Sequence, residues 1–248
     1  HFEKAVTLDG KHAEAHLYLG KSYAALDRWP EAIVSLREAL QLTQGEHQEV
    51  KSTLFKALLG GGLEEFKKGN YQASIDYLRE GLTLRPGSLE AARQLGTTML
   101  AFGSDLLSQG KLADALSAFQ EAVLLLPENL EAWLGLAKTY YAENNPVEAL
   151  QAAMKALNLD TRSQELGALL LAIGQKLLSK GFWDQAITAF KAVLEIVPEK
   201  YEAYIGLAEA FLKSGEVQEA IETVKEALKI DPTSQEAREL LLRLLRRL

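Results

Sequence analysis

Hydrophobic and polar residues recur along the chain in one pattern, an amphipathic helix followed by a turn and a second amphipathic helix. In the first copy, His16, Gly20 and Tyr23 fall on one face of residues 13–26, which predicts a helix there. Residues 27–30 break this helix, and apolar residues on one face predict a second helix over residues 31–42. Two short helices joined by a tight turn predict an antiparallel hairpin.

The same hairpin returns along the chain around a residue that tolerates the left-handed backbone conformation, which a sharp helix reversal needs. The turn residues are Asp27, Gly69, Gly110, Asn144, Gly181 and Gly215. The trailing helices close at Gln44, Pro86, Pro127, Thr161, Pro198 and Pro232. Proline fixes its backbone angle and lacks an N–H, so it ends one helix and can begin the next. The pattern predicts a repeat protein, whose functional surface is built by several repeats.

This pattern resembles the tetratricopeptide repeat, a helix–turn–helix unit of about 34 residues. The resemblance covers nearly all of residues 1–234. Leading helices carry a large residue and, four positions later, a small one: His16, Leu58, Met99, Trp133, Leu170 and Tyr204, then Gly20, Gly62, Gly103, Ala137, Gly174 and Ala208. Trailing helices carry a small residue and then another core residue: Ala32, Ser74, Ala115, Ala149, Ala186 and Ala220, then Leu36, Leu78, Phe119, Ala153, Phe190 and Val224. The resemblance implies an all-α fold, a right-handed α-solenoid (superhelix) of antiparallel helix hairpins.

We expect one continuous array over residues 1–248, with the following divisions: a partial repeat at 1–12, repeats at 13–46, 47–88, 89–129, 130–163, 164–200 and 201–234, and a capping helix at 235–248. Repeats 2 and 3 are each longer than the family unit by about two helical turns, at ~3.6 residues per turn, and repeat 5 has a smaller excess. The extra residues favour helix, so we expect lengthened leading helices that project from one edge of the array; a bulging loop or an extra turn is the alternative. Residues 177–213 closely match residues 106–142, 71 positions earlier, which indicates a duplicated two-repeat block.

The last segment carries Leu240, Leu241, Leu244 and Leu248 on one face and its arginines more to the other. It resembles the added helix that covers the exposed end of a tetratricopeptide array. The alternative is that it docks a second chain or a further domain, which would allow a homo-oligomer through this helix. Residues 1–10 look like the tail of another repeat, so we expect a fragment of a longer protein.

Composition and charge reduce the number of possible functions. The net charge of −7 and the sequence pI near 5.3 argue against nucleic-acid binding, and no apolar run approaches the ~20 residues that membrane insertion needs. Cysteine is absent, which excludes thiolate chemistry but leaves the compartment open; we expect a soluble protein, and the cytoplasm ahead of other compartments. The four histidines lack metal-ligand spacing. We therefore predict no metal, no cofactor and no enzymatic activity, although the fold alone does not forbid an enzyme or a carrier.

Three consecutive glycines, Gly60 to Gly62, lie inside the second leading helix. They follow a helix rather than a strand and lack the Gly-Lys-Ser/Thr of a phosphate-binding loop. The first interpretation is that close helix packing demands small residues here. The alternative is that the glycines make the helix locally soft, so that the array flexes on binding.

In this family the leading helices line a concave groove that holds partner proteins. Carried over repeat by repeat, the resemblance predicts these partner-binding residues: Leu17, Lys21, Leu59, Leu63, Phe66, Leu100, Ser104, Leu107, Leu134, Lys138, Tyr141, Leu171, Gln175, Leu178, Ile205, Glu209 and Leu212. Such a groove is largely apolar and suits an amphipathic helix or an apolar peptide. The alternative is that tight winding buries these residues against one another. The lysine–asparagine clamp that some family members use for acidic peptides is not predicted, because Leu17 and Lys21 stand at its positions.

We therefore predict a non-enzymatic protein–protein interaction scaffold that binds a partner segment in its concave groove. The alternative is an architectural spacer or oligomerisation module of a larger assembly. That module would contact partners through its convex face, its projecting helices or the leucine-rich C-terminal helix.

Overall fold

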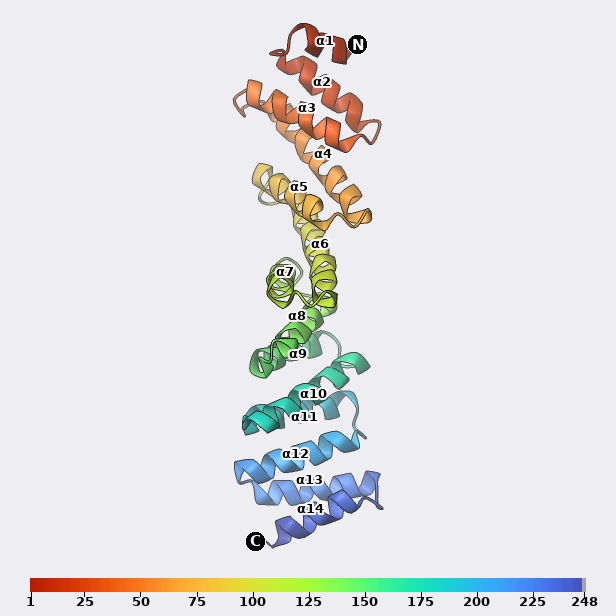
Figure 1. Ribbon diagram of the computed structural model, residues 1–248, viewed down its shortest axis with the longest axis vertical. Helices are drawn as coiled ribbons and strands as arrows, with labels where there is room; N and C mark the ends of the chain where they lie inside the picture. The colour runs from red at the N-terminus through yellow and green to blue at the C-terminus, as the bar shows by residue number, and fades with distance from the viewer. Residues whose placement is uncertain (247–248) are drawn as a thin grey trace. The chain divides into compact units, whose positions relative to one another are not determined.

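The computed structural model describes residues 1–246, except for the side chain of Ala5, and these residues form an all-α array of helix hairpins. Fourteen helices follow one another in the described residues, and short turns join them (Figure 1). The chain divides into two compact units. The first comprises His1–Phe102 with Leu124–Pro127, and the second comprises Gly103–Val123 with the chain from Glu128 onward.

The first unit begins with the short helix α1 (Phe2–Leu8) and continues with two hairpins (Figure 1). Helix α2 (Ala13–Ala24) packs on α3 (Trp29–Leu42), and α4 (Gln48–Lys67) packs on α5 (Tyr71–Leu84). Helix α3 also packs on α4, so the two hairpins share one apolar core. Helix α3 begins two residues before its predicted start, because Pro30 lies in its first turn, where the missing N–H leaves no hydrogen bond unmade.

Two helices contribute to both units. Helix α6 (Leu89–Ser108) belongs to the first unit as far as Phe102, and α7 (Leu112–Leu125) belongs to the second as far as Val123.

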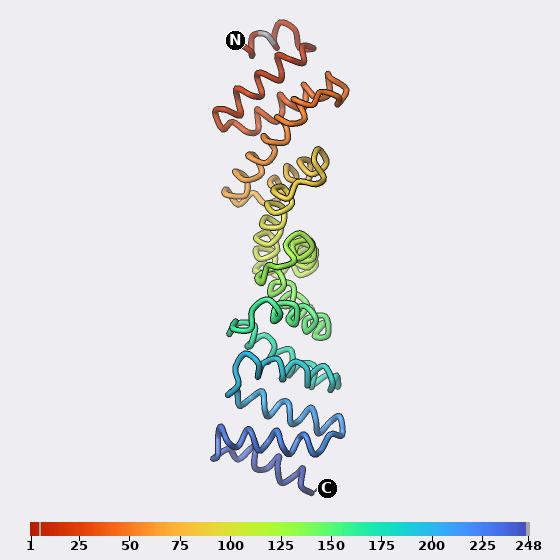
Figure 2. The backbone as a smooth tube through the Cα atoms, turned by 180° about the vertical axis from the view of Figure 1, so that it is seen from behind, coloured from red at the N-terminus to blue at the C-terminus, as the bar shows by residue number. Residues whose placement is uncertain are grey.

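The rest of the second unit consists of hairpins that stack in chain order, as Figure 2 also shows for the blue helices near the C-terminus. Its helices are α8 (Leu130–Ala142), α9 (Pro146–Leu159), α10 (Gln164–Lys180), α11 (Trp183–Ile196), α12 (Tyr201–Ser214), α13 (Val217–Ile230) and α14 (Gln235–Leu245). Each trailing helix packs on its own leading helix and on the next one, so the apolar core is continuous along this unit.

The structure confirms the predicted lengthening of the leading helices. Helices α4 and α6 each have 20 residues and α10 has 17, whereas α2, α8 and α12 have 12, 13 and 14. The extra residues of repeats 2 and 3 are therefore helical, which excludes the alternative of a bulging loop.

The predicted turn residues all have the left-handed backbone conformation. Asp27 and Asn144 have φ of 55° and 65°, and the four glycines lie between 74° and 94°. Gln44 and Gly45 also have positive φ, at the point where α3 ends without a proline.

The second unit packs a phenylalanine between glycines of two successive leading helices. A Cβ atom built on Gly174 of α10 would lie 2.9 Å from the ring of Phe190, and one built on Gly206 of α12 would lie 2.4 Å from it. The same arrangement occurs 71 positions earlier, where Phe119 of α7 meets Gly103 and Gly135 at 3.2 and 2.2 Å. Glycine at these positions leaves room for the two rings. Gly103 and Gly174 are among the predicted small positions, whereas Gly135 and Gly206 are not.

The three glycines of α4 also serve close packing. Cβ atoms on Gly60, Gly61 and Gly62 would lie 2.7 Å from Trp29, 3.0 Å from Ile33 and 2.9 Å from Leu78. Side chains of α3 and α5 occupy the space that larger residues would need, which supports the packing interpretation of this segment.

Helix α14 packs on α13 and buries Ala237, Leu240 and Leu244. Leu241 is half-buried, while Leu242 and Leu245 remain 57% and 50% exposed. The predicted face also included Leu248, and the predicted basic face included Arg247; both lie outside the described residues. In the described part of the chain, no helix is long and apolar enough to cross a membrane.

Candidate partner-binding site

The predicted partner-binding residues differ in how much surface they expose. Five lie in the core with at most 8% of their surface exposed: Leu17, Leu59, Leu134, Ile205 and Leu212. Nine are half-buried: Lys21, Phe66, Leu100, Leu107, Lys138, Tyr141, Leu171, Leu178 and Glu209. Leu63, Ser104 and Gln175 are exposed. The first group therefore serves chiefly to pack hairpins together and offers a partner little surface.

Four of the predicted residues line one cavity of about 490 Å³ in the second unit. Gln175 and Leu178 come from α10, and Ile205 and Glu209 come from α12. The other wall residues are Ser179, Phe190, Tyr201, Glu202, Gly206 and Glu236. Successive leading helices thus bring predicted residues that are distant in sequence to one site.

The walls of this cavity combine an apolar part with an acidic part. Leu178, Phe190 and Ile205 are apolar, and Gly206 presents no side chain. Three acidic residues, Glu202, Glu209 and Glu236, line the same cavity.

Hydrogen bonds and an ion pair order the polar residues of this cavity. The Tyr201 hydroxyl lies 2.5 Å from Ser234 Oγ and donates to Glu236 Oε2 at 3.3 Å; burial raises its pKa, so the hydroxyl stays protonated at neutral pH. A backbone hydrogen bond and the ion pair with Lys200, at 3.1 Å, lower the pKa of Glu202. This carboxyl group is therefore ionised at neutral pH.

Sequence reasoning missed Tyr201, Glu202 and Glu236 in the cavity wall. A signal was present, because each leading helix carries a glutamate as its second residue: Glu14, Glu49, Glu90, Glu131, Glu165, Glu202 and Glu236. A carboxylate in the first turn is stabilised by the positive end of the helix dipole.

Two cavities in the first unit contain other predicted residues. One, of about 240 Å³, has Leu63 and Phe66 in its wall, and the other, of about 350 Å³, has Leu59 and Leu63. Both also contact Gln94 of α6, whose Oε1 atom is buried and has no hydrogen-bond partner among the described residues. These cavities are smaller than the one in the second unit.

The remaining predicted residues do not line these three cavities. Some of them link successive leading helices instead. Lys21 Nζ lies 2.5 Å from Glu49 Oε1, and Lys138 Nζ lies 2.5 Å from Glu165 Oε1. The ammonium group of Lys176 lies 4.4 Å from the ring centroid of Tyr141.

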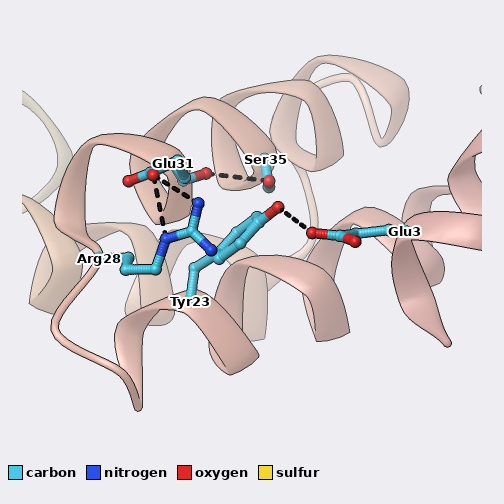
Figure 3. Close-up of polar contacts among 5 residues, drawn as sticks. All are labelled: Glu3, Tyr23, Arg28, Glu31 and Ser35. Carbon is cyan, nitrogen blue, oxygen red and sulfur yellow. Dashed lines mark hydrogen bonds and ion pairs between the residues drawn. The ribbon is translucent and has the colours of Figure 1, made fainter.

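A separate polar cluster in the first unit connects α1 to the first hairpin (Figure 3). The Tyr23 hydroxyl donates to Glu3 Oε1 at 2.6 Å, which raises the pKa of Tyr23, and the Arg28 guanidinium lies 4.6 Å from the Tyr23 ring centroid. Arg28 donates twice to Glu31 Oε1, at 3.0 and 2.7 Å, and thereby lowers the pKa of Glu31. Ser35 Oγ donates to the Glu31 carbonyl oxygen at 2.9 Å. The Tyr23 hydroxyl is therefore neutral at physiological pH and serves as a hydrogen-bond donor.

Comparison with protein-family models matches three segments to the tetratricopeptide repeat, residues 13–45, 100–163 and 177–244. The chain belongs to the tetratricopeptide repeat family. The family fold is typically a non-enzymatic scaffold for protein interactions, and the family match supports a protein-interaction scaffold as the general class of function of this chain.

Two relatives in sequence are much longer than this chain. It is 21% identical over 238 residues to the "BBSome complex member BBS4 homolog" of Drosophila melanogaster, covering 96% of this chain and 48% of that protein. It is 34% identical over 119 residues to the human "DnaJ homolog subfamily C member 3", covering 48% of this chain and 23% of that protein. The matched part of the chain therefore spans about half the length of the first relative and less than a quarter of the length of the second. Among solved structures, "Crystal structure of MamA protein" matches with a TM-score of 0.41 and 23% identity, over 72% of this chain and 92% of that chain.

Proposed function

We propose that the chain holds a segment of a partner protein against its leading helices, and that the cavity lined by α10, α12 and α14 in the second unit is the contact site. The observation that carries this proposal is the convergence of Gln175, Leu178, Ile205 and Glu209 on one cavity of about 490 Å³. This volume lies within the ~300–1,000 Å³ that is usual for ligand sites in proteins.

The composition of the wall favours an amphipathic helix or an extended segment with apolar side chains. Leu178, which is half-buried, offers apolar surface that an inserted side chain would cover, and the hydrophobic effect would contribute about 25 cal/mol for each Å² removed from water. Polar groups at the edge, Gln175 and Tyr201, would fix the orientation of the segment.

One observation favours a second candidate, an architectural module that assembles through α14. Leu242 and Leu245 of this helix are 57% and 50% exposed, and exposed leucines close together on one helix are typical of protein contacts. Light scattering would test this candidate. A dimer that becomes a monomer on Leu242→Glu substitution would support it, and a monomeric wild-type chain would reject it.

The cavity proposal can be tested by selecting a phage-displayed library of random peptides against the chain. Binding of fluorescein-labelled selected peptides is then measured by fluorescence anisotropy. Gln175→Trp places a large side chain at the cavity from an exposed position and should weaken binding at least about tenfold, a loss of about 1.4 kcal/mol.

The matched control is Gln151→Trp, because Gln151 is also exposed but lies on the trailing helix α9. It should leave the affinity unchanged. Equal affinity of the wild type and both variants for every selected peptide would reject the cavity as the contact site.

A further inference from the structure

Two ion pairs between successive leading helices join equivalent residues. Lys21 of α2 pairs with Glu49 of α4, and Lys138 of α8 pairs with Glu165 of α10, each at 2.5 Å between Nζ and Oε1. In both cases the acidic partner is the second residue of the next leading helix. A lysine in the second half of one leading helix thus pairs with the carboxylate in the first turn of the next.

The 71-residue correspondence continues beyond residue 213, since residues 234–236 repeat residues 163–165, but one charge of the ion pair differs between the copies. Glu209 of α12 lies 71 positions after Lys138, and Glu236 of α14 lies 71 positions after Glu165. The lysine of the first copy is therefore a glutamate in the second. Two carboxylates occupy the positions that an ion pair occupies in the first copy, and both of them line the cavity of about 490 Å³.

Nearby cations are engaged elsewhere. Lys200 pairs with Glu202 at 3.1 Å, and Arg238 donates to the carbonyl oxygen of Pro232 at 2.6 Å. Among the described residues Glu209 forms no ion pair, and Glu236 accepts only the Tyr201 hydroxyl, at 3.3 Å. The cavity thus has excess negative charge beside apolar surface.

We infer that the partner segment supplies the missing cation. A lysine or arginine side chain of the bound segment lies between Glu209 and Glu236, and a neighbouring apolar side chain of the same segment covers Leu178. This inference rests on the proposed function, and it specifies the chemistry of the partner: a segment of another protein in which a basic residue adjoins an apolar one.

Charge complementarity excludes other segments from this site. An acidic segment would meet the carboxylates of Glu202, Glu209 and Glu236, and like charges in a partly desolvated site repel. A purely apolar segment would remove these carboxylates from water without a counter-charge. The net charge of −7 also attracts basic partners from a distance.

The test uses the peptides selected on the wild-type chain. We expect lysine or arginine beside an apolar residue to be enriched in those peptides whose binding Gln175→Trp blocks. Glu209→Lys recreates the lysine–glutamate pair of the first copy. It should weaken the binding of these peptides about tenfold to a hundredfold, because the charge-assisted hydrogen bonds between the peptide cation and Glu209 are lost.

Two further variants separate this effect from its alternatives. Glu195→Lys makes the same charge change at an exposed position of the trailing helix α11 that does not line the cavity, and it should alter affinity less than about twofold, since exposed charges are screened by salt. Glu209→Gln keeps the size of the side chain and should weaken binding at least about threefold. Replacing the basic residue of the peptide by glutamine should lower the affinity for the wild-type chain but change the affinity for Glu209→Lys little. A double-mutant cycle measures this difference.

The outcomes distinguish the two proposals. Peptides that Gln175→Trp blocks, but that bind Glu209→Lys and Glu209→Gln as tightly as wild type, would overturn the cationic partner and leave the cavity as the site. If Gln175→Trp blocks no selected peptide, the cavity itself is rejected. Thermal unfolding of Glu209→Lys should match or exceed that of the wild type, because the variant restores an ion pair.

Discussion

The contact between Gly206 and Phe190 leads to a prediction in which two effects of opposite sign compete. In the interior of a helix, alanine is favoured over glycine by about 1 kcal/mol, so Gly206→Ala would stabilise α12 if the new methyl group had room. It has none. The Cβ atom would lie 2.4 Å from Cζ and 2.5 Å from Cε1 of Phe190.

The ring cannot move away from the new methyl group. Phe190 is 0% exposed and also packs on Gly174 of α10, where a Cβ would lie at 2.9 Å. Overpacking of a dense core costs about 1–3 kcal/mol, and because this ring is held by two helices we expect a cost near the upper end. After the gain in helix propensity, Gly206→Ala should destabilise the chain by about 1–2 kcal/mol.

Urea unfolding followed by circular dichroism measures this effect as a shift of the midpoint. The matched control is Gly167→Ala in α10, where the nearest atom, Cγ2 of Ile196, would lie 3.4 Å from the new Cβ. This control should stabilise by up to about 1 kcal/mol, because only the helix propensity changes.

A second substitution tests the cause. Leucine stands at the positions equivalent to Phe190 in the first two repeats, Leu36 and Leu78. In the Phe190→Leu background, Gly206→Ala should cost less than in the wild type by about 0.5–3 kcal/mol, the range found for residues in direct contact. If Gly206→Ala raised the midpoint as much as Gly167→Ala does, the argument from close packing would be refuted.

Three further predictions follow from backbone conformation, burial and charge. Gly215→Ala should lower the free energy of unfolding by about 1–2 kcal/mol, seen as a lower urea midpoint, because φ there is +94°, although a Cβ would meet no atom within 4 Å. An unchanged midpoint would contradict the cost assigned to the left-handed conformation. Leu134→Glu should cost about 3–5 kcal/mol and reduce the helical signal, because Leu134 is 6% exposed and the charge would be buried without a partner, whereas Tyr141→Glu, at a half-buried site, should preserve that signal. Hydrogen bonds from Arg28 and Lys21 lower the folded-state pKa of Glu31 and Glu49 below 4.5, so their stabilisation is complete above that pH and is lost as the pH falls through the lower values. The thermal midpoint should therefore be flat between about pH 7 and 5 and drop below about pH 4, less steeply in high salt.

Features that depend on neighbouring residues could be predicted from the sequence. The positive φ at Asp27, Asn144 and the turn glycines follows from residue chemistry at a helix end, and the length of α4 and α6 follows from counting residues between turns. Each of these properties is determined within one hairpin.

Features that depend on the next hairpin could be predicted only in part. Leu134 and Ile205 were expected in an open groove but are only 6% and 7% exposed, because their helices pack closely against neighbouring helices. Gln175 and Glu209 were predicted and line the cavity, while Glu236 was not, because its role depends on how α14 lies beside α12. Periodicity assigns a residue to a face of its own helix, but which atoms cover that face is decided by residues on the neighbouring helices of the array.

The phenylalanine that packs between glycines of two leading helices also determines where the array could be cut and rejoined. Gly135 and Gly206 occupy the same position relative to their phenylalanines, 71 residues apart. A gene that joined residue 135 directly to residue 207 would remove one two-repeat block, yet Phe119 would keep a glycine on both sides. A junction out of this register would bring a side chain against the ring. The contact therefore defines an exchange point at which an engineer could shorten, lengthen or recombine the array without redesigning its core.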